Sequence, residues 1–287
     1  MQICCTGFIH RGSKYISCYA ENSAHKIVIS KKSHNLVKNM TPEISVIVPV
    51  LNEAKYLETT LQMIVNQNTN VDYELMVSDN GSTDGSMDIA KEYADCVLQC
   101  EEIGIGAARH FGALHGDNSS KYLLFVDADT HIPGYYLAYL YETFKADPDL
   151  IAFSTGFNFS ERTEHVKFAE NVANKYFILR DKLRSATLPG FNTAVRREAY
   201  FKCGGYQNVL LEDVDFSRRI DQLGTVKYFP LIKVINSSRR LEAMGLLGTL
   251  YYYTQLDLGW ELNSTWIDKL SKKLGIADLR EYIGIRK

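Results

Sequence analysis

The stretch from Tyr122 to Thr130 joins an apolar run of strand length to two aspartates. Because side chains alternate along an extended chain, Asp127 and Asp129 point the same way and Ala128 points the other way. A run this apolar predicts a strand buried on both faces of a largely parallel sheet. Ligands of open α/β sheets bind at the carboxyl ends of the strands, where two carboxylates suit a hard divalent cation that grips substrate phosphates. An acidic strand end that faces solvent is the alternative interpretation.

Length and composition indicate a globular chain with an ample core. The sequence has 287 residues, of which 46% are hydrophobic and 23% charged, which is enough for one large α/β domain or two small ones. The net charge of −2 gives no support for a nucleic-acid surface. No run of about 20 apolar residues is present, so no membrane-spanning helix is expected. The six cysteines form no CxxC pair, which favours reduced thiols in a cytoplasmic protein over a zinc site that includes Cys96 and Cys100.

Apolar runs alternate with helical patterns along most of the chain. Strands are predicted over 44–50, 73–78, 96–99 and 122–126. Strands that alternate with helices predict right-handed crossovers and a mostly parallel central sheet flanked by helices. The second half adds a predicted helix over 137–144, a strand over 150–156, a long aromatic helix over 166–177, a strand within 189–197, and one or two short strands within 228–235.

The chain is expected to form one α/β domain with an extension at each end. Residues 41–240 are predicted to carry the domain, with a nucleotide-binding half over 41–130 and an acceptor half over 131–240. Residues 1–40 lack strong apolar periodicity and predict a poorly defined extension, with an extra edge hairpin as the alternative. Residues 241–287 predict a helical tail that packs on the domain through an apolar, aromatic face. The alternative for this tail is peripheral contact with the inner face of a membrane.

Polar side chains follow several of the predicted strands. Asp79 ends the second strand, Arg109 lies beyond the third, and Asp127 and Asp129 end the fourth. Because the carboxyl ends of parallel strands meet at one edge of the sheet, these side chains are expected to converge. A carboxylate for a base or ribose, an arginine near phosphates and a metal-binding pair are what a nucleoside-diphosphate site needs. Taken singly, Asp79 also fits a turn residue and Arg109 a solvated helix residue.

Four segments resemble, in order and spacing, the motifs of family-2 glycosyltransferases of the GT-A fold. They are Ser-Val-Ile-Val-Pro-Val-Leu-Asn-Glu (45–53), Val-Ser-Asp-Asn-Gly-Ser-Thr-Asp (77–84), Gly-Ala-Ala-Arg-His-Phe-Gly (106–112) and Val-Asp-Ala-Asp (126–129). The resemblance implies an inverting enzyme that uses Mg²⁺ or Mn²⁺ to move a sugar from a UDP- or GDP-sugar to an acceptor hydroxyl. It further implies a glycan or lipid-linked acceptor and a place in cell-surface glycan or glycolipid synthesis.

The resemblance also implies roles for single residues of the donor site. These are Pro49, Asn52 and Glu53 in the nucleoside pocket, Asp79 at the base, Arg109 near the base or diphosphate, Asp127 at the ribose or metal, Asp129 on the metal, and Gly190 and Asn192 beside the donor sugar and acceptor. Two positions depart from the family pattern, because Asn80 stands where an aspartate is frequent and His110 where an asparagine is frequent. These departures leave the base preference open.

Two charged pairs in the second half complete the predicted site. Glu212 and Asp213 begin a predicted helix, where the macrodipole favours acidic residues in any protein. They also resemble the family's Glu-Asp motif, which implies that Asp213 is the general base that takes the acceptor proton. Arg239 and Arg240 are either surface charges or, as the resemblance implies, partners of the leaving diphosphate.

Two other functions stay open at this point. A nucleotidyltransferase also combines paired carboxylates, a metal and an α/β sheet, but it needs a basic phosphate loop where Asn52 and Glu53 stand. A catalytically silent sugar-nucleotide-binding protein of the same fold is the non-enzymatic alternative. The intact pair of Glu212 and Asp213 argues against it.

Overall fold

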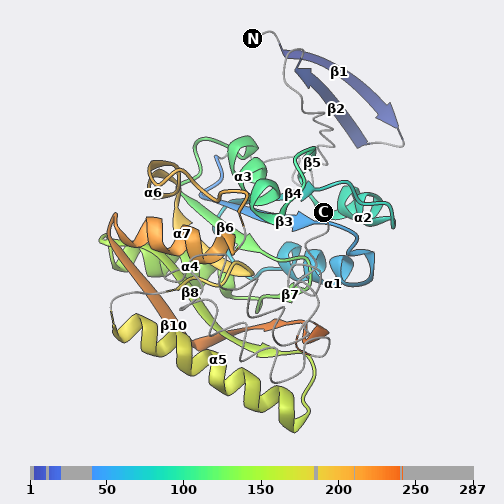
Figure 1. Cartoon of the computed structure of the whole chain (residues 1–287). Helices are drawn as coiled ribbons and strands as arrows, with labels where there is room; N and C mark the ends of the chain where they lie inside the picture. The colour runs from blue at the N-terminus through green and yellow to red at the C-terminus, as the bar shows by residue number, and fades with distance from the viewer. Residues whose placement is uncertain are drawn as a thin grey trace, which may run out of the picture.

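The computed structural model describes residues 3–10, 13–20, 41–183, 187–209, 211–239 and 241. An eight-stranded sheet with helices on both faces forms the main body, and a separate two-stranded hairpin precedes it (Figure 1). The hairpin consists of β1 (Ile3–His10) and β2 (Ser13–Ala20). None of the helices described is both long and apolar enough to cross a membrane.

The main sheet has the strand order β5-β4-β3-β6-β9-β8-β10-β7. Its strands are β3 (Ile44–Val50), β4 (Tyr73–Asp79), β5 (Cys96–Gln99), β6 (Tyr122–Val126), β7 (Thr130–His131), β8 (Leu150–Phe159), β9 (Asn192–Arg196) and β10 (Thr225–Asn236). The first four of these are parallel to one another where they pair. Strand β9 runs antiparallel between β6 and β8, while β10 is parallel to β8 and antiparallel to β7.

Seven helices of the described chain cover the two faces of this sheet. They are α1 (Ala54–Val65), α2 (Ser86–Tyr93), α3 (Ile105–His115), α4 (Tyr136–Ala146), α5 (Glu164–Lys182), α6 (Arg197–Lys202) and α7 (Glu212–Asp221). Side chains alternate between the two faces of the sheet along β3. On one face, Val46 and Val48 pack with residues of α1, α2, α4 and α5. Ile47 points to the other face and packs with residues of α3, α6 and α7. Both faces of the central strands are therefore buried, as their continuous apolar sequence predicts.

The site is positioned by the point where the strand order reverses. From β3 the chain moves outward to β4 and then β5, and afterwards returns to β6 on the other side of β3. The helices that follow these two strands, α1 and α4, pack on the same face of the sheet. Ligands of open α/β sheets bind in the crevice at the carboxyl ends of the strands at such a reversal. Asn52 and Glu53 follow β3, and Asp127 and Asp129 follow β6.

The predicted α/β architecture is confirmed, and the differences lie in the second half. Strand β10 is one continuous strand, because a bulge between Phe229 and Lys233 shifts its register against β8 without ending it. The bulge presses against Gly156, where a Cβ atom would lie 2.6 Å from the carbonyl oxygen of Pro230. The two-residue strand β7 was not predicted, because two residues carry no periodicity. At the amino end, β1 and β2 pair with each other and not with an edge of the main sheet. The predicted helical tail over 241–287 lies outside the described residues, apart from Leu241.

Candidate active site

The loops that follow β3 and β4 are tied together by hydrogen bonds. Asn52 adopts a left-handed backbone conformation with φ 56°, which asparagine tolerates better than most residues. Its backbone N–H donates to Ser82 Oγ at 2.8 Å, and its side-chain oxygen accepts from the N–H of Thr83 at 2.8 Å. The N–H of Glu53 donates to Ser86 Oγ at 2.9 Å. The loop after β3 is thus held against the loop after β4.

Asp79 lies at the floor of these loops and is almost fully buried. One carboxylate oxygen accepts the N–H groups of Gly81 and Ser82 at 3.0 and 3.1 Å. The other oxygen, Oδ1, is buried without a hydrogen-bond partner. A buried acceptor of this kind needs a donor, and an N–H of a nucleobase has the right chemistry. Pro49 is buried within β3, where it pairs with Ser78, the residue before this aspartate.

Asn80 organises the neighbouring loop. Its amide nitrogen donates to the carbonyls of Cys100 and Glu102 at 3.1 and 2.7 Å, and its oxygen accepts from the N–H of Gly104 at 2.7 Å. An aspartate at this position would have no donor for the two carbonyls. The departure from the family pattern therefore shapes the loop that leads into α3.

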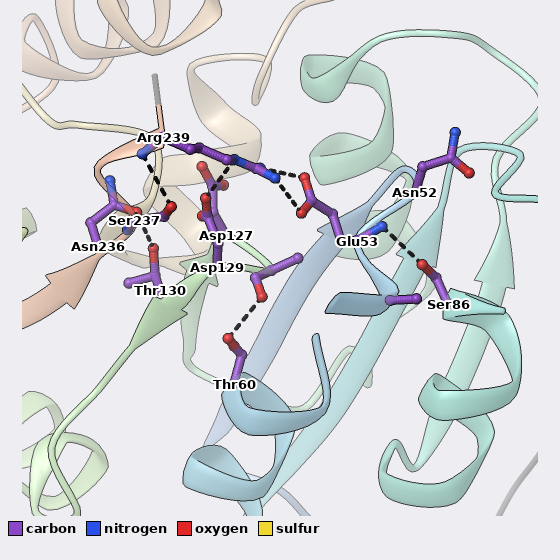
Figure 2. Close-up of polar contacts among 12 residues, drawn as sticks. Asn52, Glu53, Thr60, Ser86, Asp127, Asp129, Thr130, Asn236, Ser237 and Arg239 are labelled. Carbon is purple, nitrogen blue, oxygen red and sulfur yellow. Dashed lines mark hydrogen bonds and ion pairs between the residues drawn. The ribbon is translucent and has the colours of Figure 1, made fainter. Parts of the chain in front are cut away.

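Arg239 spans the crevice over the acidic pair, as Figure 2 shows. Its Nε lies 3.1 Å from Asp129 Oδ2, and both Nη groups donate to the carboxylate of Glu53. The guanidinium also lies 5.3 Å from the ring centroid of Tyr56. Burial alone would lower the pKa of Arg239, but Glu53 and Asp129 outweigh it and raise the pKa above its ordinary value. A cation therefore stands at the end of β6, and the predicted companion Arg240 lies outside the described residues.

Arg109 carries a second cation, which is buried. Its Nη2 donates to Asp127 Oδ1 at 2.7 Å, and its Nη1 donates to Glu212 Oε1 at 2.6 Å. The guanidinium lies 5.1 Å from the ring centroid of Tyr206. Burial would lower the pKa of Arg109, but the charges of Asp127 and Glu212 raise it. The guanidinium thus lies between two carboxylates, which compensate the cost of burying its charge. The place near the base or diphosphate that the resemblance implied for Arg109 stays a prediction.

Asp213 is half-buried in the first turn of α7 beside Glu212. Burial, followed by the negative charge of Glu212, raises the pKa of Asp213 to about 7. Arg109 and the N–H groups of Gly190 and Val214 act in the opposite direction. A carboxylate with a pKa near neutrality can both take and release a proton at physiological pH.

The predicted residues near the donor sugar divide into two kinds. Gly190 packs directly on a guanidinium, since a Cβ atom there would lie 2.6 Å from Arg109 Nη1. Asn192 is fully buried, donates to Thr155 Oγ1 at 2.7 Å, and accepts from the hydroxyl of Tyr136. Its amide is bonded to protein groups beneath the loop, so the structure places it as an anchor of that loop.

The two aspartates after β6 fit a hard divalent cation. Mg²⁺ and Mn²⁺ are commonly bound by one or two carboxylates and take their other ligands from water and substrate phosphates. Asp127 and Asp129 supply such a pair, and Arg239 already shows that this point attracts positive charge. Within the described ranges no group of three or more His, Cys, Asp or Glu residues could hold a metal. Such a cation would therefore take its other ligands from water or from a diphosphate.

Three residues of the site were not predicted from the sequence. Tyr206 lies under the Arg109 guanidinium, and Tyr56 lies against Arg239. Ser217 accepts from the N–H of Leu188 at 2.8 Å and donates to the carbonyl of Asp213 at 2.6 Å. Only Ser217 carried a signal, because it stands four residues after the predicted base on one helix.

A sheet with this strand order, with carboxylates at its switch point, defines an α/β protein of the open-sheet class, whose ligands bind at this edge of the sheet. The family model for glycosyl transferase family 2 matches residues 45–204. The chain therefore belongs to glycosyl transferase family 2, as its motifs predicted.

Relatives and solved structures agree with this membership. The chain is 35% identical over 124 residues to Glycosyltransferase GlyA of Streptococcus pneumoniae serotype 4, covering 42% of this chain and 17% of that protein. It is 35% identical over 95 residues to Glycosyltransferase AglE of Haloferax volcanii, covering 31% of each. The matched segment is thus less than a third of the length of either relative.

Two solved structures share the fold. The mannosyltransferase PcManGT of Pyrobaculum calidifontis, in complex with GDP-Man and Mn²⁺, has a TM-score of 0.58 at 22% identity, covering 76% of this chain and 65% of that one. S. aureus TarS 1-349 in complex with UDP-GlcNAc has a TM-score of 0.56 at 18% identity, covering 68% and 58%. At these identities the likeness shows the GT-A fold and confirms the predicted fold class.

Proposed function

We propose that this protein is an inverting glycosyltransferase that moves a sugar from a nucleoside-diphosphate sugar to an acceptor hydroxyl in the synthesis of cell-surface glycan or glycolipid. The observation that carries the proposal is the arrangement of carboxylates at one switch point. In this proposal Asp79 binds the base, Asp127 and Asp129 hold a cation on the diphosphate, and Asp213 meets the acceptor. Ligands of related folds, GDP-Man with Mn²⁺ and UDP-GlcNAc, are of the proposed donor class.

The reaction needs a base, a leaving group and a fixed approach. Asp213 takes the proton of the acceptor hydroxyl while that oxygen forms a bond to the anomeric carbon. The bond from the anomeric carbon to the diphosphate oxygen breaks on the opposite face, so the configuration inverts and the nucleoside diphosphate leaves with the electron pair. Arg239 is placed to donate to the diphosphate as its charge grows.

Asp127 and Asp129 would hold Mg²⁺ or Mn²⁺ in this scheme. When bound, the cation neutralises charge on the diphosphate and thereby makes it a better leaving group. The acceptor is proposed to be a glycan or a lipid-linked sugar. Membership of the glycosyltransferase family argues against a nucleotidyltransferase, and turnover separates an enzyme from a silent binding protein.

A thermal-shift panel tests the donor site. UDP, GDP, CDP and TDP are added with and without Mn²⁺ to the wild-type chain and to Asp129→Ala, since a ligand of the folded state raises Tm by mass action. We expect one diphosphate to raise Tm by several degrees only with Mn²⁺, and no such shift in Asp129→Ala. The absence of a metal-dependent shift from all four diphosphates would refute the donor site.

A further inference from the structure

Arg109 connects parts of the site that lie far apart in the sequence. It belongs to α3, and its two ion pairs reach Asp127 at the end of β6 and Glu212 at the start of α7. These partners are 18 and 103 residues away along the chain. The planar fork of an arginine can donate to two carboxylates in fixed directions from a single buried position.

The start of α7 needs such an anchor. Leu211 precedes the helix with φ 58° and ψ 50°, a left-handed conformation that is strained for a leucine, and no side chain caps the helix. Three carboxylates, from Glu212, Asp213 and Asp215, stand in the first turn. They repel one another although the helix dipole favours each of them. Arg109 places a buried positive charge against this turn.

The loop before β9 is built around the same guanidinium. Gly190 leaves the space that the guanidinium fills, since a Cβ atom would lie 2.6 Å from Nη1. The N–H of Gly190 also donates to the Asp213 carboxylate. A displacement of the Arg109 guanidinium would therefore move both the first turn of α7 and the loop that holds Asp213.

We propose that Arg109 is a positioning residue that holds the first turn of α7, and with it Asp213, in fixed register with the acidic end of β6. The donor side and the acceptor side of the crevice then behave as one unit. The inference rests on the proposed function for the role of Asp213, but the anchoring of α7 can be measured without any substrate. Arg109 touches neither the acceptor nor the anomeric carbon in this proposal.

Arg109→Lys tests this role, and Arg197→Lys is the matched control. A lysine keeps the positive charge of residue 109 but presents one ammonium group, which cannot span both carboxylates. Arg197 is also buried and donates to Ser45 and Ser120 near the amino ends of β3 and β6, away from the site. Both substitutions disturb a buried arginine network, so a general loss of stability affects both variants.

The first measurement is hydrogen exchange of the full-length chain without ligands. We expect the backbone amides of 211–217 to exchange about tenfold faster in Arg109→Lys than in the wild type, because the anchored turn opens locally. The same amides should keep the wild-type rate in Arg197→Lys. A wild-type rate in Arg109→Lys, or an equal acceleration in both variants, would overturn the proposal.

The second measurement is hydrolysis of UDP-GlcNAc, UDP-glucose and GDP-mannose with water as the acceptor. We expect kcat of Arg109→Lys to fall about 100-fold while KM for the donor stays within about threefold, because misplacement of a reacting group lowers turnover more than binding. A loss that appears only in KM would contradict a positioning role. If the wild type hydrolyses none of the three donors, water does not replace the acceptor, and the exchange data alone decide whether Arg109 anchors α7.

Discussion

The site contains two arginine bridges of similar design in different surroundings. Arg109 and Arg239 each join a carboxylate at the end of β6 to a carboxylate at the start of a helix, which is α7 for the first and α1 for the second. The side chain of Arg109 is 2% exposed, whereas that of Arg239 is 36% exposed. The same ion chemistry is therefore used once in the interior and once at the mouth of the crevice.

Burial decides what each bridge can do. Breaking a buried ion pair leaves a charge without compensation and costs about 3–5 kcal/mol, whereas an exposed pair contributes about 0–1 kcal/mol. Arg109 is thus a fixed part of the framework. Arg239 can give up its carboxylates when other ions enter the crevice. We call the ion pairs of Arg109 the inner bridge and those of Arg239 the outer bridge. We infer that the inner bridge fixes the geometry of the site and that the outer bridge exchanges partners during donor binding.

The largest expected effect comes from the residue that the inner bridge positions. Asp213→Asn should lower kcat about 10³-fold, since it removes the proton acceptor, and leave the Mn²⁺-dependent thermal shift by the nucleoside diphosphate intact. The raised pKa of Asp213, about 7, means that the base is protonated below that pH. Wild-type turnover should therefore rise as the pH increases from 6 to 8.

Asp215→Asn is the control for this prediction. Asp215 stands in the same turn of α7, but its carboxylate is paired with Arg219. The kcat of Asp215→Asn should stay within a few fold of the wild-type value. Wild-type turnover in Asp213→Asn would show that this aspartate is not the base.

A smaller effect is expected when the inner bridge is displaced without any change of charge. Gly190→Ala places a Cβ atom 2.6 and 2.7 Å from the two Nη atoms of Arg109, so the guanidinium must shift. Because small misplacements near the reacting atoms are costly, kcat should fall about 30-fold. Gly134→Ala is the control, since nothing lies within 4 Å of its added Cβ atom. Equal turnover of the two variants would show that the inner bridge tolerates displacement.

The sequence predicted the first half of this fold well for a physical reason. Strands β3 to β6 are buried on both faces, so each appears as a continuous apolar run between turn-forming residues. The acidic pair follows β6 directly, as the end of the apolar run predicted. However, Asp127 and Asp129 lie in a turn, in which the N–H of Thr130 donates to the carbonyl of Asp127, and not in the extended segment that the alternation argument assumed. The continuity of β10 was not predicted, because Pro230 and the exposed Leu231 interrupt its pattern.

The partners of the site residues were harder to predict. Strand position brings side chains to one edge of the sheet, but it does not say which of them meet. Arg109 pairs with Glu212 across 103 residues of sequence, and no local pattern carries that information. The burial of Asn192 was equally hidden, because it depends on Tyr136 of α4, which lies 56 residues earlier in the chain.

The smallest effects are expected at the outer bridge, and they should have opposite signs for two ligands. Arg239→Gln removes the cation that occupies Asp129, so Mn²⁺ alone should bind about fivefold tighter, as expected for an exposed ion pair of about 1 kcal/mol. The same variant lacks a charged donor for the diphosphate, so UDP or GDP with Mn²⁺ should bind about tenfold more weakly. Electron paramagnetic resonance of Mn²⁺ and titration calorimetry of the nucleotide measure the two affinities.

Arg162→Gln separates this result from a general change in surface charge. Arg162 also bridges to a carboxylate, that of Glu170, and its side chain is 54% exposed. Both affinities should stay at wild-type values in this variant. A uniform loss of both affinities in Arg239→Gln would mean that Arg239 supports the fold of the mouth, and a uniform gain would mean that it only competes with cations. Opposite signs require an arginine that leaves Asp129 for the incoming diphosphate, which the inner bridge at Arg109 is too deeply buried to do.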